Sequence, residues 1–66
     1  MNIKERLIEL HKAQIAEIEY YKRKEISSRA NQDRMVLYYT AMADAHDEFA
    51  KEISLLICGI DKGYLQ

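Results

Sequence analysis

Apolar side chains recur every three or four residues along the second half of the chain. From residue 35 they alternate strictly between steps of four and three residues, for just over three heptads. The positions are Met35, Tyr39, Met42, His46, Phe49, Ile53, Leu56 and Ile60. This period of 3.5 residues is typical of a helix that lays one face against another helix. The pattern predicts a long helix over residues 32–61.

The first half of the chain carries a wider apolar stripe. Ile3, Leu7 and Leu10 lie along one flank, and Ile8, Ile15 and Ile26 lie along the other. Between them runs a midline of Leu7, His11, Gln14, Ile18 and Tyr21. At 100° per residue these positions spread over roughly 160°, more than the ~100° of a helix with one covered side. We therefore predict a helix over residues 2–27 that contacts two neighbours.

Between these two helices the inward positions turn polar at Glu25, Ser28 and Gln32. Ser27, Ser28, Asn31 and Asp33 favour helix caps over helix interiors because their side chains compete for backbone hydrogen bonds. The sequence predicts a turn over residues 28–31, with Asn31 capping the second helix. The alternative is one continuous helix in a long coiled coil, since no residue here forbids helix.

The predicted fold is all-α: one helical domain over residues 1–66, an antiparallel two-helix hairpin with a tail at 62–66. Gly59 or Gly63 is the expected residue just past the second helix, and the apolar pattern that reaches Ile60 favours Gly63. A hairpin offers the wide first helix only one neighbour, so we expect two copies to form a four-helix bundle. The expected oligomer or partner interface is apolar. It comprises Ile3, Leu7, Ile8, Leu10, Ile15, Phe49, Ile53, Leu56, Ile57 and Ile60.

Chain length supports the same expectation. In a chain of 66 residues, the hydrophobic core rarely supplies more than about 3–5 kcal/mol of folding stability. The single cysteine, Cys58, excludes an intramolecular disulfide. The apolar run "ISLLICGI" is far shorter than the roughly 20 residues needed to span a bilayer, and the N-terminus lacks a secretory pattern. We expect a cytoplasmic protein that forms a homodimer or docks on another protein.

His11 and His46 are the residues most suggestive of chemistry. The hairpin brings both to the same level on inward positions. Two interpretations remain open: a polar layer that fixes the helix register, with or without pH sensitivity, and a metal site. The di-metal pattern Glu-x-x-His is missing, and so are phosphate loops and nucleophile–base pairs. We predict no enzymatic activity, no cofactor and no metal, with His11 and His46 as weak metal candidates.

Tyrosines and charges suggest two binding surfaces. A protein partner would meet exposed aromatic and acidic side chains of the hairpin, namely Tyr20, Tyr38, Asp44, Asp47 and Glu48. Residues 1–34 carry eight Lys or Arg against six Asp or Glu, whereas residues 35–66 carry two against five. A nucleic acid would meet the cations near the turn, namely Lys22, Arg23, Lys24, Arg29 and Arg34. Residues 22, 23 and 24 point about 100° apart on a helix, so they cannot form one stripe.

Two functional hypotheses follow from these surfaces. The first is a small non-enzymatic regulator, inhibitor or adaptor that binds another protein, a role frequent among small proteins, including those of phages and mobile elements. The second is a small helical bundle that binds RNA or DNA through the basic tip. Salt-sensitive binding of nucleic acid would favour the second hypothesis.

Overall fold

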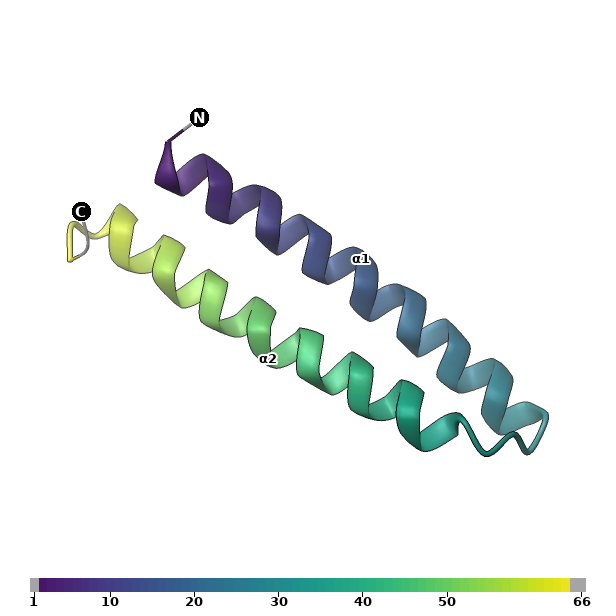
Figure 1. Ribbon diagram of the computed structural model, residues 1–66. Helices are drawn as coiled ribbons and strands as arrows, with labels where there is room; N and C mark the ends of the chain where they lie inside the picture. The colour runs from purple at the N-terminus through teal and green to yellow at the C-terminus, as the bar shows by residue number, and fades with distance from the viewer. Residues whose placement is uncertain (1, 65–66) are drawn as a thin grey trace.

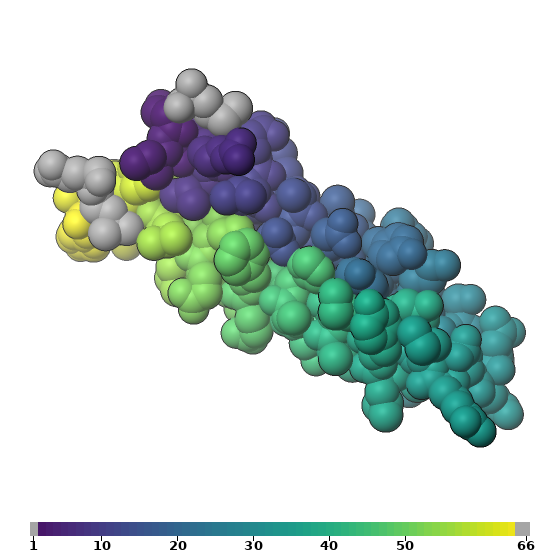
Figure 2. Space-filling view, viewed as in Figure 1, coloured from purple at the N-terminus to yellow at the C-terminus, as the bar shows by residue number. Residues whose placement is uncertain are grey.

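Residues 2–64 of the computed structural model form two antiparallel helices, α1 (Ile3–Ala30) and α2 (Val36–Asp61), joined by residues 31–35. Figure 1 shows the helices lying side by side along their length, with both ends of the chain at one end of the rod. The predicted all-α hairpin is confirmed, and the alternative of one continuous helix is wrong. The chain is a slender rod of 48 × 19 × 11 Å (Figure 2).

Helix α1 begins with a capping box. The Asn2 side-chain oxygen accepts a hydrogen bond from the Glu5 N–H at 2.8 Å, and a Glu5 carboxylate oxygen accepts one from the Asn2 N–H at 3.4 Å. These two bonds satisfy backbone donors that have no partner within the helix. The pattern Asn-x-x-Glu was present in the sequence as a start signal.

The turn lies about four residues later than predicted. Helix α1 continues through Ser28, whose side chain is buried, and ends in a Schellman motif with Gln32 at φ 54°. Asn31 ends α1 and does not cap α2, which corrects the predicted cap. The N-cap of α2 is Met35, which makes no side-chain capping bond; its N–H donates to the Asp33 carboxylate in the turn at 2.9 Å.

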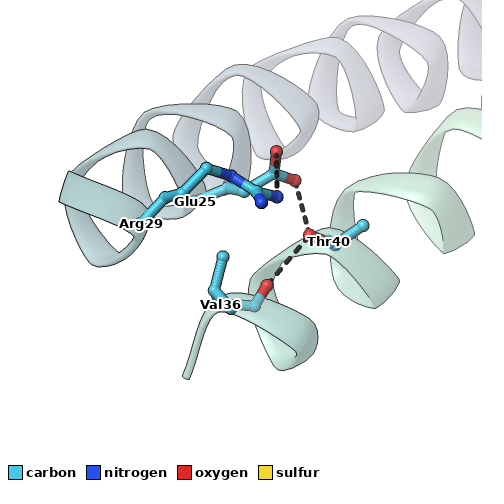
Figure 3. Close-up of polar contacts among 4 residues, drawn as sticks. All are labelled: Glu25, Arg29, Val36 and Thr40. Carbon is cyan, nitrogen blue, oxygen red and sulfur yellow. Dashed lines mark hydrogen bonds and ion pairs between the residues drawn. The ribbon is translucent and has the colours of Figure 1, made fainter. Parts of the chain in front are cut away.

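Glu25 explains why the helix continues where the seam turns polar. One carboxylate oxygen accepts a hydrogen bond from the Thr40 hydroxyl at 2.7 Å, and the other pairs with Arg29 at 3.5 Å (Figure 3). The Thr40 hydroxyl also lies 2.9 Å from the Val36 carbonyl oxygen. A polar seam position can therefore join the helices once its hydrogen bonds are satisfied.

Helix α2 ends at Asp61, and Gly63 follows just past its end, as predicted. The φ of Gly63 is 79°, the left-handed conformation that favours glycine. The N–H groups of Gly63 and Tyr64 donate to the carbonyls of Ile60 and Gly59 at 3.1 and 2.8 Å. Tyr64 is exposed. Residues 65 and 66 of the predicted tail lie outside the described residues.

The core is thin. Within residues 2–64, the buried apolar residues are Ile18, Ala43, Ala50 and Ile53, and no large side chain is completely buried. Ala43 and Ala50 have small side chains, which allow the two helices to approach each other closely. Most of the larger apolar side chains are therefore only half covered by the hairpin itself.

Candidate functional site

The hairpin has two edges that differ in chemistry, and the contacts across the helices define them. Gln14 and Tyr21 of α1 contact His46 and Tyr39 of α2 on one side of the seam. On the other side Lys4 pairs with Asp61 at 2.6 Å. Because residues three and four apart are neighbours on a helix, each side of the seam can be followed outward to the exposed edge next to it.

The ion-paired edge follows the Lys4–Asp61 side of the seam. Every α2 residue that borders the seam here is polar, and two of the four on α1 are cations. The edge comprises Ile8, Ile15, Lys22 and Arg29 of α1 with Thr40, Asp47, Ser54 and Asp61 of α2. Its charges are largely occupied: Arg29 pairs with Glu25, Asp61 with Lys4, and Asp47 with Lys51 at 3.2 Å.

The apolar edge follows the Gln14–His46 side of the seam. Its apolar residues are Ile3 and Leu10 of α1 with Met35, Met42, Phe49 and Leu56 of the α2 side, and the same spacing of seven on α1 continues with the charged residues Glu17 and Lys24. The four α2-side residues are spaced seven apart, so they form one line of about 30 Å at 1.5 Å per residue. Phe49 is 49% exposed and Leu56 44% exposed. A line of large apolar side chains thus lies open to solvent along one edge of the rod.

This edge changes the interpretation of the apolar pattern in the second half. The seam that faces α1 consists of residues 36, 39, 43, 46, 50, 53, 57 and 60, none of which is exposed and which include the buried positions of α2, Ala43, Ala50 and Ile53. Only Tyr39, His46, Ile53 and Ile60 of the predicted seam belong to it. The other four predicted positions form the α2 side of the apolar edge.

The predicted interface residues accordingly fall into three groups. Leu7, Ile53, Ile57 and Ile60 lie in the seam and are covered or half covered by the hairpin itself. Ile3, Leu10, Phe49 and Leu56 lie on the apolar edge and are exposed. Ile8 is half-buried and Ile15 is exposed, and both lie on the ion-paired edge.

An aromatic cluster occupies the half of the hairpin near the turn, with the Tyr21 ring as its hub. The ring lies 5.1 Å from Tyr20, 6.4 Å from Tyr38 and 6.3 Å from Tyr39, centroid to centroid. It also stacks on the His46 imidazole at 5.6 Å and an interplanar angle of 12°. Partial burial, followed by the nearby Tyr38 hydroxyl, raises the pKa of Tyr21.

The outer rings of the cluster, Tyr20 and Tyr38, are exposed but held in place. Tyr38 packs edge-on against Tyr39 at 5.5 Å, and the Lys24 ammonium lies 5.6 Å from the centroid of the Tyr20 ring. Asp44 and Glu48 are also exposed on α2, about 120° and 80° around the helix from Tyr38. We call Tyr20, Tyr38, Asp44 and Glu48 the tyrosine face. The predicted fifth member, Asp47, is half-buried, and its carboxylate raises the pKa of Lys51.

His46 makes a polar contact across the seam, but its partner is Gln14 and not His11. The imidazole Nδ1 lies 2.5 Å from the Gln14 Oε1. Because an amide oxygen can only accept, Nδ1 carries the proton and donates it. His11 is half-buried one turn before Gln14 on α1. Among residues 2–64, His, Cys, Asp and Glu side chains do not gather in a group of three that could hold a metal ion.

The five predicted nucleic-acid contacts are spread around the helix and the turn. Lys22 and Arg29 lie on the ion-paired edge, Arg23 on the outer side of α1, and Arg34 in the turn. Lys24 lies over Tyr20, on the other side of the helix from Lys22. The structure does not bring these cations into one patch.

Comparison with known proteins adds no family to this description, because no family model, curated protein or solved structure matches the chain. The described part of the chain encloses no pocket. In residues 2–64 neither helix combines the length and apolar character needed to cross a membrane. The apolar edge and the tyrosine face are thus the surfaces on which a functional argument rests.

Proposed function

We propose that this protein is a non-enzymatic regulator, inhibitor or adaptor that binds another protein through its tyrosine face. The observation that supports the proposal is the aromatic cluster. Tyr20 and Tyr38 are exposed, yet each contacts Tyr21, and Tyr38 also contacts Tyr39. Aromatic side chains that are already ordered lose little conformational entropy on binding, which is why tyrosine is enriched among residues that dominate interfaces.

The chemistry around the two rings indicates the kind of partner. Tyr38 and Tyr20 offer apolar ring faces with a polar hydroxyl. Asp44 and Glu48 add negative charge on the same helix as Tyr38. A complementary protein surface has apolar side chains for the rings and Lys or Arg side chains beside them. The acidic excess of residues 35–66 favours the same kind of partner.

A photo-crosslinking amino acid at position 38 tests where the partner binds. We expect crosslinks from position 38 to one protein in the cells that make this chain, and none to that protein from position 54. Ser54 is a suitable control because it is exposed on the ion-paired edge of the same helix. Crosslinks from position 54 alone would contradict the proposed surface.

The affinity for the crosslinked partner then tests the role of the ring. Tyr38→Ala removes an ordered aromatic side chain and lowers the affinity about tenfold or more. Tyr64→Ala is the matched control, because Tyr64 is exposed at the end of the chain and lies outside the cluster; its affinity stays within about twofold. Equal effects of both variants contradict the proposal. A second result would also contradict the proposal: the purified protein carries nucleic acid and gives no protein crosslink. The absorbance ratio at 260 and 280 nm detects bound nucleic acid.

A further inference from the structure

The hairpin alone is only one layer thick. Within residues 2–64 two helices lie side by side, and no third element packs on either of them. Stable domains bury their apolar faces between two or more packed layers. The side chains between α1 and α2 include four buried apolar residues among the described part of the chain. The architecture therefore lacks the second layer that would cover its remaining apolar surface.

The apolar edge has the size that an interface requires. From the exposed fractions of Ile3, Leu10, Met35, Phe49 and Leu56 it presents on the order of 500 Å² of surface, with Met42 half-buried between them. A stable interface takes about 800 Å² from each partner, of which roughly 60% is apolar. The edge thus matches the apolar share of one standard interface.

We infer that the apolar edge is covered by the apolar edge of a second copy of the chain, so that two hairpins form a four-helix bundle. A twofold interface uses the same patch on both copies, so one line of apolar residues is sufficient. The bundle supplies the second layer. The apolar edge borders the tyrosine face, because Met35 and Met42 lie three residues before and four residues after Tyr38. The inference does not depend on the proposed function.

The composition of the edge favours a copy over an unrelated protein. A chain whose own core contains four buried apolar residues needs cover whenever it is folded, and a second copy is present wherever the chain is made. The ion-paired edge offers less for such a contact, because Lys4, Arg29, Asp47 and Asp61 already have partners. The dimer contact therefore uses the apolar edge and not the ion-paired edge.

Sedimentation equilibrium of two matched variants tests both the dimer and the edge. Wild type should have twice the 7.8 kDa mass of the chain. Phe49→Glu places a charge on the apolar edge and weakens association a hundredfold or more. Ile15→Glu is the control, since Ile15 is 40% exposed against 49% for Phe49 but lies on the ion-paired edge. It leaves the association constant within about threefold.

Three results would overturn the inference: a wild-type mass of 7.8 kDa at all concentrations, dissociation by Ile15→Glu in place of Phe49→Glu, or equal effects of both. Should Phe49→Glu unfold the chain, the wild type supplies a second measurement. The melting temperature of a dimer that folds with its association rises with protein concentration. A melting temperature that is independent of concentration contradicts the dimer. Crosslinking from position 38 is a separate readout from the mass of the chain, so failure of the dimer and failure of the proposed function can be told apart.

Discussion

At the scale of single residues, the two helix ends show the same motif built with different residues. Gln32 follows α1 at φ 54°, and Gly63 follows α2 at φ 79°. At both ends, the N–H of this residue and the N–H of the residue after it donate to carbonyl groups in the last turn of the helix. A left-handed conformation costs a residue with a Cβ atom roughly 1–2 kcal/mol, whereas glycine adopts it freely. Gln32 is therefore a strained position in an otherwise favourable turn.

Replacing Gln32 by glycine should stabilise the hairpin. The relief of strain exceeds the greater flexibility of glycine in the unfolded chain, so we expect a net gain of about 0.5–1 kcal/mol and a rise in melting temperature of roughly 2–8 °C. Gly63→Ala should lower stability by about 1 kcal/mol or less, because a strained helix end can fray. Thermal unfolding followed by circular dichroism measures both. A fall in melting temperature for Gln32→Gly would contradict the account of the turn.

The pKa of Tyr21 makes the stability of the folded chain depend on pH. Burial and the Tyr38 hydroxyl raise its pKa above the ordinary value of 10.0, so the folded chain holds the phenol proton more tightly than the unfolded chain does. The resulting stabilisation is complete below the unfolded pKa of about 10. It is lost as the pH rises through the higher folded pKa.

Tyr21→Phe should remove this pH dependence. Between about pH 9 and pH 11 we expect the wild type to lose stability more steeply than Tyr21→Phe. Tyr64→Phe is the control: it also removes one hydroxyl, but from an exposed residue outside the cluster, and should retain the wild-type slope. Urea unfolding at several pH values gives the slopes. Parallel curves for wild type and Tyr21→Phe would show that Tyr21 carries no such linkage.

At the scale of the helices, small residues determine which face of α2 meets α1. Ala43 and Ala50 are each 4% exposed, while Phe49, next to Ala50 in sequence, lies half in solvent. An alanine contributes little apolar area of its own, but it brings the two backbones close enough for Ile18 and Ile53 to be covered. The packing of the hairpin therefore depends on the few large side chains that reach the seam.

Ile53 is the most deeply buried of them, at 2% exposed. Ile53→Ala should cost about 2–4 kcal/mol through lost burial and the cavity left behind, which is most of the stability that a chain of this size can have. Leu55→Ala removes a similar side chain that is 67% exposed and should cost about 0.5 kcal/mol or less. Chemical unfolding of both variants gives the difference. Similar losses would contradict the assigned seam.

The sequence predicted both helices and the midline of the first, because large apolar residues mark those positions. It could not separate the two faces of the second helix. Tyr39, His46, Ile53 and Ile60 belong equally to a seam completed by Phe49 and Leu56 or to one completed by Ala50 and Ile57. Hydrophobicity favours the larger residues, whereas close helix approach selects the smaller ones.

The position of the turn was missed for a related reason. Polar residues at inward positions predict an end to helix packing, yet Glu25 contacts Thr40 across the helices. Such a contact depends on which residue lies opposite, and that is known only once the register is fixed. The tyrosine face was predicted as a set of residues. Its ordering around Tyr21 could not be predicted, because it depends on the same register.

At the scale of the whole molecule, the hairpin is a rod with one ion-paired edge, one apolar edge and a tyrosine face beside the turn. The wide stripe of the first helix already indicated that the hairpin alone would leave apolar surface uncovered. The structure adds where that surface lies and that the α2 side contributes four of its six apolar residues. We propose that the apolar edge joins two copies and that the neighbouring tyrosine face binds a protein partner.

Radical footprinting of the wild-type chain at high concentration tests this division of the surface most directly, because it reports side-chain exposure residue by residue. We expect Phe49 and Leu56 to be protected, although each is nearly half exposed in the single hairpin, and Leu37 and Leu55, which lie on the outer side of α2, to react freely. On dilution, Phe49 and Leu56 should gain reactivity while Leu37 and Leu55 stay unchanged. Reactivity of Phe49 and Leu56 that already matches their exposure in the single hairpin, and does not change on dilution, would contradict the account.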